Sequence, residues 1–109
     1  MLSPKETECL NACNDCTTAC VQSATACLKE IDPKAMARCI ALDRECADIC
    51  RMAATSITCD SKHMKTICAL CAEACQNCAN ECDKHEMGHC KNCAEICKHC
   101  AELCRGMVH

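Results

Sequence analysis

The apolar positions of this chain recur at intervals of three and four residues, and cysteine occupies most of them. Over residues 68–82 the cysteines are spaced 3, 4, 3 and 4 apart, and over residues 90–104 the same spacing repeats. Over residues 9–27 the intervals are 4, 3, 4 and 7. Residues three and four apart share one face of an α-helix, so each run forms a single stripe. The pattern predicts amphipathic helices whose buried face is lined by cysteine.

Start and stop signals divide the sequence into four helical segments. Ser3-Pro4-Lys5-Glu6 combines an N-cap serine, a proline at the first helical position and a capping-box glutamate. Asp32-Pro33 repeats this start, Asp60-Ser61 offers a third N-cap, and Gly106 stands where a C-terminal cap belongs. The helices are expected to cover roughly residues 4–30, 33–58, 61–84 and 89–106. Short connections make neighbouring helices antiparallel, so we expect an all-α, up-down-up-down four-helix bundle, with residues 1–109 forming one domain.

An internal repeat accompanies the spacing. Residues 68–82 align with residues 90–104 at a shift of 22 with all five cysteines in register, and the core of the pattern appears again over residues 9–20. The second helix diverges, because its cysteines are interleaved with Met36, Ala53 and Ile57. The repetition indicates that the number of sites matters more than any single catalytic geometry.

The cysteine content first suggests a disulfide scaffold, since 19 of 109 residues are cysteine. An odd count leaves at least one thiol unpaired, and two glycines and two prolines supply few of the turns that such scaffolds need. Thiols along one helix face have roughly parallel Cβ directions, which suit a shared ligand better than an S–S bond. We therefore reject a disulfide framework and expect free thiols.

Thiolates select soft metal ions, so Cu(I), Zn(II) and iron–sulfur clusters are the candidates. One monovalent ion per thiolate leaves a neutral core, whereas tetrahedral zinc with four thiolates leaves a charge of about −2 at each site. Charge therefore favours Cu(I), at close to one ion per cysteine. A zinc or general heavy-metal thiolate buffer is the first alternative and an iron–sulfur redox protein the second, although no cysteine here is followed by proline as in the bacterial ferredoxin run.

The remaining composition excludes several functions. The net charge is −3 and the chain has no Phe, Tyr or Trp, so we expect no nucleic-acid binding. No run of apolar residues is long enough for a membrane span, and the first residues lack a basic region followed by an apolar stretch, so we expect neither a membrane segment nor an export signal. No thiol stands out as a nucleophile, and we expect no enzyme activity.

Methionine and histidine extend the stripes toward the expected bundle ends. Met36, Met64, Met87 and Met107 lie three or four residues from a cysteine, and His85 lies three after Cys82. Such softer, neutral ligands suit the transfer of Cu(I) in and out, although methionine also fills irregular bundle ends in packing alone. His85 and His89 are candidate ligands at one end, and His109 lies near the other. His99 is expected to face outward.

The residues together resemble the copper storage proteins, four-helix bundles with cysteine-lined cores. The most specific segment is Leu42-Asp43-Arg44-Glu45-Cys46-Ala47-Asp48-Ile49-Cys50, supported by residues 67–72 and 90–94. The resemblance implies many Cu(I) ions in the interior, a folded apo form, a homotetramer and, without an export signal, a cytosolic location. Asp60 resembles an acidic residue near one mouth of the family's bundle, although it also fits a helix N-cap. The ligands that the resemblance implies are Cys9, Cys13, Cys16, Cys20, Cys27, Cys39, Cys46, Cys50, Cys59, Cys68, Cys71, Cys75, Cys78, Cys82, Cys90, Cys93, Cys97, Cys100 and Cys104.

Overall fold

The computed structural model describes residues 1–108, and His109 lies outside the described residues. Within them the chain forms four α-helices and one 3₁₀ turn. The helices are α1 (Pro4–Cys27), α2 (Ala37–Thr58), α3 (Met64–Cys82) and α4 (Gly88–Gly106), and the 3₁₀ turn η1 (Pro33–Met36) precedes α2. No residue from 1 to 108 is in a β-strand.

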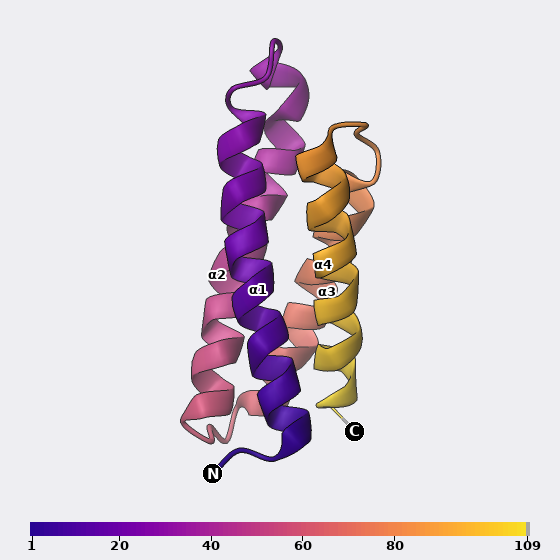
Figure 1. The fold of residues 1–109 in the computed structure, drawn as a ribbon. Helices are drawn as coiled ribbons and strands as arrows, with labels where there is room; N and C mark the ends of the chain where they lie inside the picture. The colour runs from indigo at the N-terminus through magenta and orange to yellow at the C-terminus, as the bar shows by residue number, and fades with distance from the viewer. Residues whose placement is uncertain (109) are drawn as a thin grey trace.

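The helices form the expected up-down-up-down bundle (Figure 1). Helix α1 packs against α2 and α4, and α3 packs against the same two helices. The molecule is a rod of 46 × 18 × 17 Å. The turn between α1 and α2 extends beyond the loop between α3 and α4, and both chain termini lie at the opposite end (Figure 1). The prediction of an all-α four-helix bundle is confirmed.

The structure confirms the predicted helix start at Ser3 but not the one at Asp32. At Ser3 the capping box is complete, because the Ser3 hydroxyl accepts from the Glu6 backbone N–H at 3.1 Å and the Glu6 carboxylate accepts from the Ser3 N–H at 2.8 Å. Asp32 makes no side-chain cap, and Pro33 begins a single 3₁₀ turn before α2 starts at Ala37. The first helix ends at Cys27, three residues earlier than expected.

Asp60 was expected as an N-cap of the third helix, and this prediction is wrong. Its φ of 52° places it in the left-handed region just after α2. The Asp60 N–H donates to the Ile57 carbonyl and the Ser61 N–H donates to the Ser56 carbonyl at 3.0 Å, the two bonds of a Schellman C-cap. Aspartate tolerates this conformation better than most residues. Gly106, expected as a C-terminal cap, is instead the last residue of α4.

The core consists of thiols and methyl groups. The buried residues are mainly cysteine and alanine, and the only larger apolar side chains among the described buried residues are Met36, Ile57 and Met107. Partly buried aliphatic side chains such as Ile49, Ile67 and Ile96 pack against the cysteines from the flanks. Burial of small side chains removes little apolar area from water, so this core stabilises the metal-free bundle only modestly.

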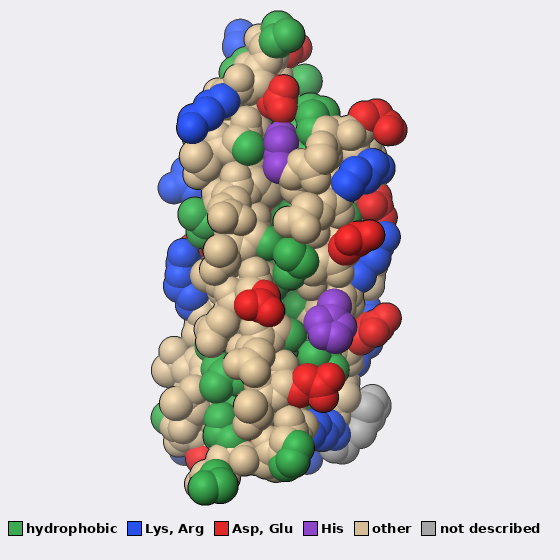
Figure 2. All heavy atoms as spheres, in the orientation of Figure 1, with side chains coloured by type: hydrophobic (Ala, Val, Ile, Leu, Met, Phe, Trp, Pro, Cys, Tyr) green, Lys and Arg blue, Asp and Glu red, His purple; other side chains and the backbone are tan. Residues whose placement is uncertain are grey.

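Acidic and basic side chains are interspersed over the face shown in Figure 2. Val21, Leu28, Met52 and Leu70 are the larger apolar side chains exposed along the helices. Across the described residues, no helix has both the length and the apolar character that a bilayer crossing requires.

Candidate metal centre

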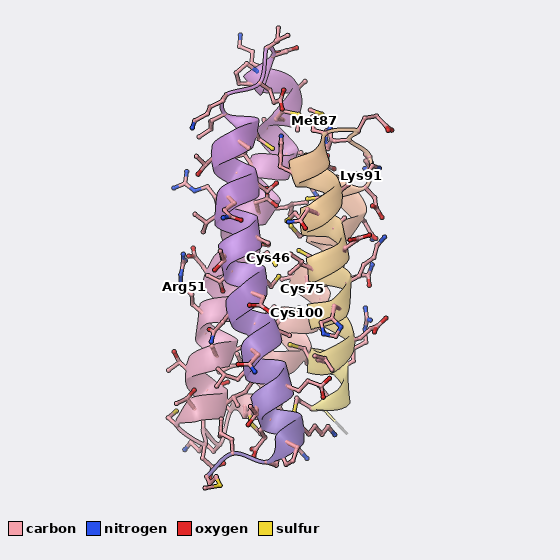
Figure 3. All side chains as sticks on the ribbon, viewed as in Figure 1. Cys46, Arg51, Cys75, Met87, Lys91 and Cys100 are labelled. Atoms are coloured by element: carbon pink, nitrogen blue, oxygen red, sulfur yellow. The ribbon has the colours of Figure 1, made fainter. Side chains whose placement is uncertain are left out.

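All but one of the predicted thiol ligands point into the bundle. Eighteen cysteines are buried with at most 1% of their surface exposed, and none of the 19 is in a disulfide. Cys46 of α2, Cys75 of α3 and Cys100 of α4 point into the space between the helices, whereas Arg51 points away from it (Figure 3). Cys59 is exposed and follows the last residue of α2, so the structure does not bring it to the other thiols.

The interior thiols already lie at the separation that shared metal ligation needs. Cys16 Sγ is 3.6 Å from Cys97 Sγ and 3.8 Å from Cys75 Sγ, so thiols of three helices meet at one point. Cys46 Sγ lies 3.6 Å from Cys75 Sγ. Metal–sulfur bonds of ~2.3 Å place two sulfurs of one ion roughly 3.8–4.0 Å apart. Small adjustments would therefore let one ion bind neighbouring thiols.

These thiols form one continuous series, which we call the thiol column. In each of five groups of four, the sulfur atoms lie within 4.8 Å of one another. Consecutive groups have two cysteines in common, so no group is separate from the next. In order along the bundle they are Cys13, Cys71, Cys100 and Cys104; Cys50, Cys71, Cys75 and Cys100; Cys16, Cys46, Cys50 and Cys75; Cys16, Cys20, Cys46 and Cys97; and Cys20, Cys78, Cys93 and Cys97.

Asp43 lies beside the last of these groups, and the sequence analysis did not select it as a site residue. Its side chain is fully buried on α2. The Asp43 Oδ1 atom accepts from the thiols of Cys78 at 3.0 Å, Cys93 at 3.4 Å and Cys82 at 3.5 Å, and Oδ2 is 3.8 Å from Cys39 Sγ. We call Asp43 with these four cysteines the Asp43 layer. In this layer the carboxylate oxygens of Asp43 lie among the thiols of the core.

The spacing of cysteines contained a signal for this layer. The stripe of α2 has a gap of seven residues between Cys39 and Cys46, and Asp43 occupies the missing step. In α1 the equivalent gap is filled by Ser23, which is 1% exposed and whose hydroxyl makes no hydrogen bond with any described residue. A stripe position that holds a polar residue between two cysteines thus marks a buried oxygen.

Burial raises the pKa of Asp43 to about 6, and the charge of Cys93 adds to the rise, while the approach of the Cys78 thiol and the Ser23 hydroxyl opposes it. Burial also raises the pKa of the Cys27 thiol to about 11. For Cys90 the pKa is raised by burial and further by Cys27. Cys27 and Cys90 are therefore protonated at neutral pH in the metal-free protein, and each must release its proton to bind a metal ion.

His85 and His89 occupy different positions at the end opposite the termini. His89 Nδ1 lies 3.5 Å from Cys90 Sγ and 3.9 Å from Cys27 Sγ, while its Nε2 is held by Glu30 at 2.9 Å. A carboxylate on one ring nitrogen orients the other toward a ligand site. His85 Nε2 instead bonds to Glu81 at 3.0 Å. The structure therefore brings the His89 ring to the thiols, whereas the His85 ring bonds to Glu81.

The other candidate residues at the bundle ends differ in their burial and in their contacts. Met36 and Met107 are buried, and Met64 and Met87 are partly buried. Met87 lies at the end formed by the α3–α4 loop (Figure 3). Asp60 is exposed on the turn between α2 and α3, and no contact joins its carboxylate to a thiol among the described residues. His99 is exposed on α4, as expected.

The contrast between Cys59 and the interior predicts a clear difference in thiol reactivity. In the reduced, metal-free protein, Cys59 is expected to react with a thiol reagent at least about a hundredfold faster than the other 18, because they become accessible only when the bundle opens. The reaction can be followed by absorbance. Cys59→Ser should remove the fast phase, and a fast phase that persists in this variant would contradict the placement of Cys59.

A four-helix bundle with a continuous interior column of thiols defines a protein of the metal–thiolate class. Comparison with known proteins narrows this class. Residues 3–109 match the family described as copper storage protein. The chain belongs to the copper storage protein family.

Individual relatives agree with this assignment. An uncharacterized cysteine-rich protein, YhjQ, of Bacillus subtilis (strain 168) is 50% identical over 100 residues, which are 92% of this chain and 93% of that protein. The Cu(I)-bound copper storage protein BsCsp3 is similar in structure, with a TM-score of 0.93 and 48% identity over 96% of this chain and 99% of that one. A cytosolic copper storage protein from Streptomyces lividans, solved with five coppers, has a TM-score of 0.92 and 30% identity over 95% of this chain and 92% of that one.

Proposed function

We propose that this protein stores Cu(I) by binding many ions to the thiolates of its interior. The observation that carries the proposal is the thiol column, in which consecutive four-thiol groups have two cysteines in common. Ions placed along such a column must be joined by bridging sulfurs. Bridging by thiolates suits a soft ion that takes two or three ligands, which is Cu(I).

Charge supports the same choice. Eighteen buried thiolates without cations would be prohibitively costly in a low-dielectric interior. One Cu(I) per thiolate replaces each proton by one positive charge and leaves the column neutral. Zinc needs four thiolates for each isolated site, so the twelve thiols of the column would hold three zinc ions in groups that do not overlap, each left with a charge of about −2. A zinc buffer is therefore the weaker proposal.

An iron–sulfur redox role has less support. Iron–sulfur clusters are held by cysteines on loops or short spacings that wrap the cluster. Here the buried thiols lie on four long helices, and the positions between the helices are filled by neighbouring thiols at 3.6–4.0 Å. Catalysis by a cysteine nucleophile would need a thiol that a substrate can reach, and the column thiols are buried. We infer a storage and detoxification role, not an enzyme.

The proposal includes a location and an assembly. We propose a cytosolic protein, by similarity to the cytosolic Streptomyces relative. We also propose a homotetramer, as the family resemblance implies. The exposed apolar side chains Val21, Leu28, Met52 and Leu70 support association of copies. Light scattering coupled to size-exclusion chromatography tests this assembly, and a mass near 11.8 kDa would contradict it.

Among the proposed ligands, the cysteines of the column bind copper and His89 takes part in its transfer at the end opposite the termini. His89→Ala is expected to slow Cu(I) loading and removal several-fold, because the ring nitrogen beside Cys90 and Cys27 is lost. Stopped-flow absorbance follows both rates. His85→Ala should have a smaller effect, since that ring bonds to Glu81 and makes no hydrogen bond to a thiol among the described residues. His99→Ala is the matched control, and equal rates in all three variants would contradict a role for this end.

Storage requires that copper stays bound in a reducing environment and still leaves on demand. Loaded protein is expected to keep its Cu(I) during dialysis against a millimolar low-molecular-weight thiol and an excess of Zn(II). It should release the copper to a strong Cu(I) chelator. Metal content is measured after each step. Loss of most copper to the thiol or to zinc would overturn the storage proposal.

A further inference from the structure

The Asp43 layer differs chemically from the rest of the thiol column. A single oxygen atom, Asp43 Oδ1, accepts from three thiols on two other helices, Cys78 and Cys82 of α3 and Cys93 of α4. A carboxylate is a hard ligand, and a purely soft ion such as Cu(I) gains little from it. Binding of Cu(I) by thiolates alone does not call for a carboxylate at this fully buried position.

The distances within the layer lie near those between the ligand atoms of a small tetrahedral ion. Zn–S bonds of ~2.3 Å and Zn–O bonds of ~2.1 Å separate two sulfurs by about 3.8 Å and a sulfur from an oxygen by about 3.6 Å. Here the three S···O distances are 3.0, 3.4 and 3.5 Å. Cys78 Sγ is 4.0 Å from Cys82 Sγ and within 4.8 Å of Cys93 Sγ. Three sulfurs from two helices therefore lie within 3.5 Å of one carboxylate oxygen.

We propose that Asp43, Cys78, Cys82 and Cys93 form a site for one divalent ion of the zinc type in the copper-free protein. Zinc accepts mixed sulfur and oxygen ligands in tetrahedral sites, whereas the groups farther along the column offer sulfur alone. The ion replaces the thiol protons, which pass to solvent, so about three protons leave for each ion bound. This site adds a second class of metal to the protein and goes beyond its copper role.

A second observation comes from the facing helix. Ser23 is 1% exposed, fills the stripe position between Cys20 and Cys27, and has no hydrogen-bond partner among residues 1–108. A buried hydroxyl without a partner, at the α1 stripe position that corresponds to Asp43 in the stripe of α2, is an available donor in this part of the core.

Co²⁺ is a suitable probe because it takes tetrahedral zinc sites and its absorption reports both geometry and sulfur ligation. Reduced apo protein is titrated anaerobically with Co²⁺, and Zn²⁺ is then added to displace it. We expect one tight equivalent per chain with the spectrum of a tetrahedral ion bound to three sulfurs. Asp43→Asn should weaken that equivalent at least about tenfold. Asp48→Asn, at an exposed position on the same helix, should leave it unchanged.

A pair of thiol variants keeps the test independent of Asp43. Cys93→Ser removes a ligand of the Asp43 layer, whereas Cys46→Ser removes a thiol that belongs to two all-sulfur groups and makes no hydrogen bond with Asp43. The first should abolish the tight equivalent and the second should retain it. Far-ultraviolet circular dichroism checks that each variant is folded.

Two results would overturn the inference. The first is a tight Co²⁺ equivalent that Asp43→Asn leaves intact, and the second is equal weakening by Cys46→Ser and Cys93→Ser, which would place the ion in a four-sulfur group. Cu(I) capacity is measured on the same samples. Normal copper capacity without a divalent site would reject this inference alone, whereas loss of both would reject the copper proposal as well.

Discussion

Loading the reduced protein with Cu(I) is expected to raise the free energy of unfolding by at least about 10 kcal/mol. The apo core is made of small side chains, so apolar burial stabilises it only modestly. Cu(I) ions would join thiols of all four helices, since the sulfurs of Cys46, Cys75 and Cys97 each lie within 3.9 Å of Cys16 Sγ. Unfolding of the loaded form must break these links. Guanidinium denaturation followed by circular dichroism measures the difference.

Two controls define this result. Removal of copper with a strong chelator should return the unfolding midpoint to that of the apo protein, which shows that the change is reversible. Cys59→Ser should be stabilised by copper as much as the natural sequence, because Cys59 lies outside the column. If the loaded and apo forms unfold at the same denaturant concentration, the ions do not link the helices and the interior location is wrong.

Asp43→Asn is expected to stabilise the metal-free protein by about 2–3 kcal/mol near pH 7.5. Asp43 is fully buried, and burial raises its pKa from 3.8 to about 6, so its ionisation in the folded state is unfavourable at neutral pH. Asparagine keeps the shape and an accepting oxygen for the thiols but carries no charge. A change of this size raises the thermal midpoint of a domain of this length by roughly 8–20 °C.

The same residue makes stability depend on pH in a particular direction. Because the pKa of Asp43 is higher in the folded state, its contribution is fully present below about pH 3.8 and is lost as the pH rises through about 6. The stability difference between Asp43→Asn and the natural sequence should therefore grow from pH 4 to pH 7. Asp48→Asn, at an exposed ion pair with Arg51, should differ from the natural sequence by less than about 1 kcal/mol. A difference for Asp43→Asn that is flat with pH would show that Asp43 is not ionised inside the core.

The helices and the interior of the bundle were predictable because cysteine spacing alone carries the helical period. Alternating intervals of three and four leave one face for every thiol, and the capping box at Ser3 fixed the first helix start. Short connections then left an antiparallel bundle as the economical arrangement. The same helical period also predicts that Cys59 does not face the other thiols. It lies nine residues after Cys50, or about two and a half helical turns, and so on the opposite side of α2.

Asp60 was misplaced and Asp43 was missed for the same physical reason, which is that a short acidic side chain serves several roles. Asp60 was interpreted as an N-cap, but the same side chain tolerates the left-handed conformation that ends α2. Asp43 was not predicted as a site residue, although it lies in the segment that resembles the family, because an isolated aspartate in a helix normally faces solvent. Only its position in the cysteine stripe of α2, between Cys39 and Cys46, indicates that Asp43 is buried. Contacts between helices, such as His89 with Cys27, depend on the relative rotation of the helices, which spacing does not determine.

The measurement that tests the central claim most directly is an anaerobic Cu(I) titration of the fully reduced protein, followed by thiolate-to-metal absorption in the near ultraviolet. The chain contains no Tyr or Trp, so this window is clear. The proposal predicts a linear rise that breaks near one Cu(I) per interior thiol, at about 18 equivalents per chain. A break at four or five equivalents would mean isolated four-thiolate sites and would contradict a continuous column filled with copper.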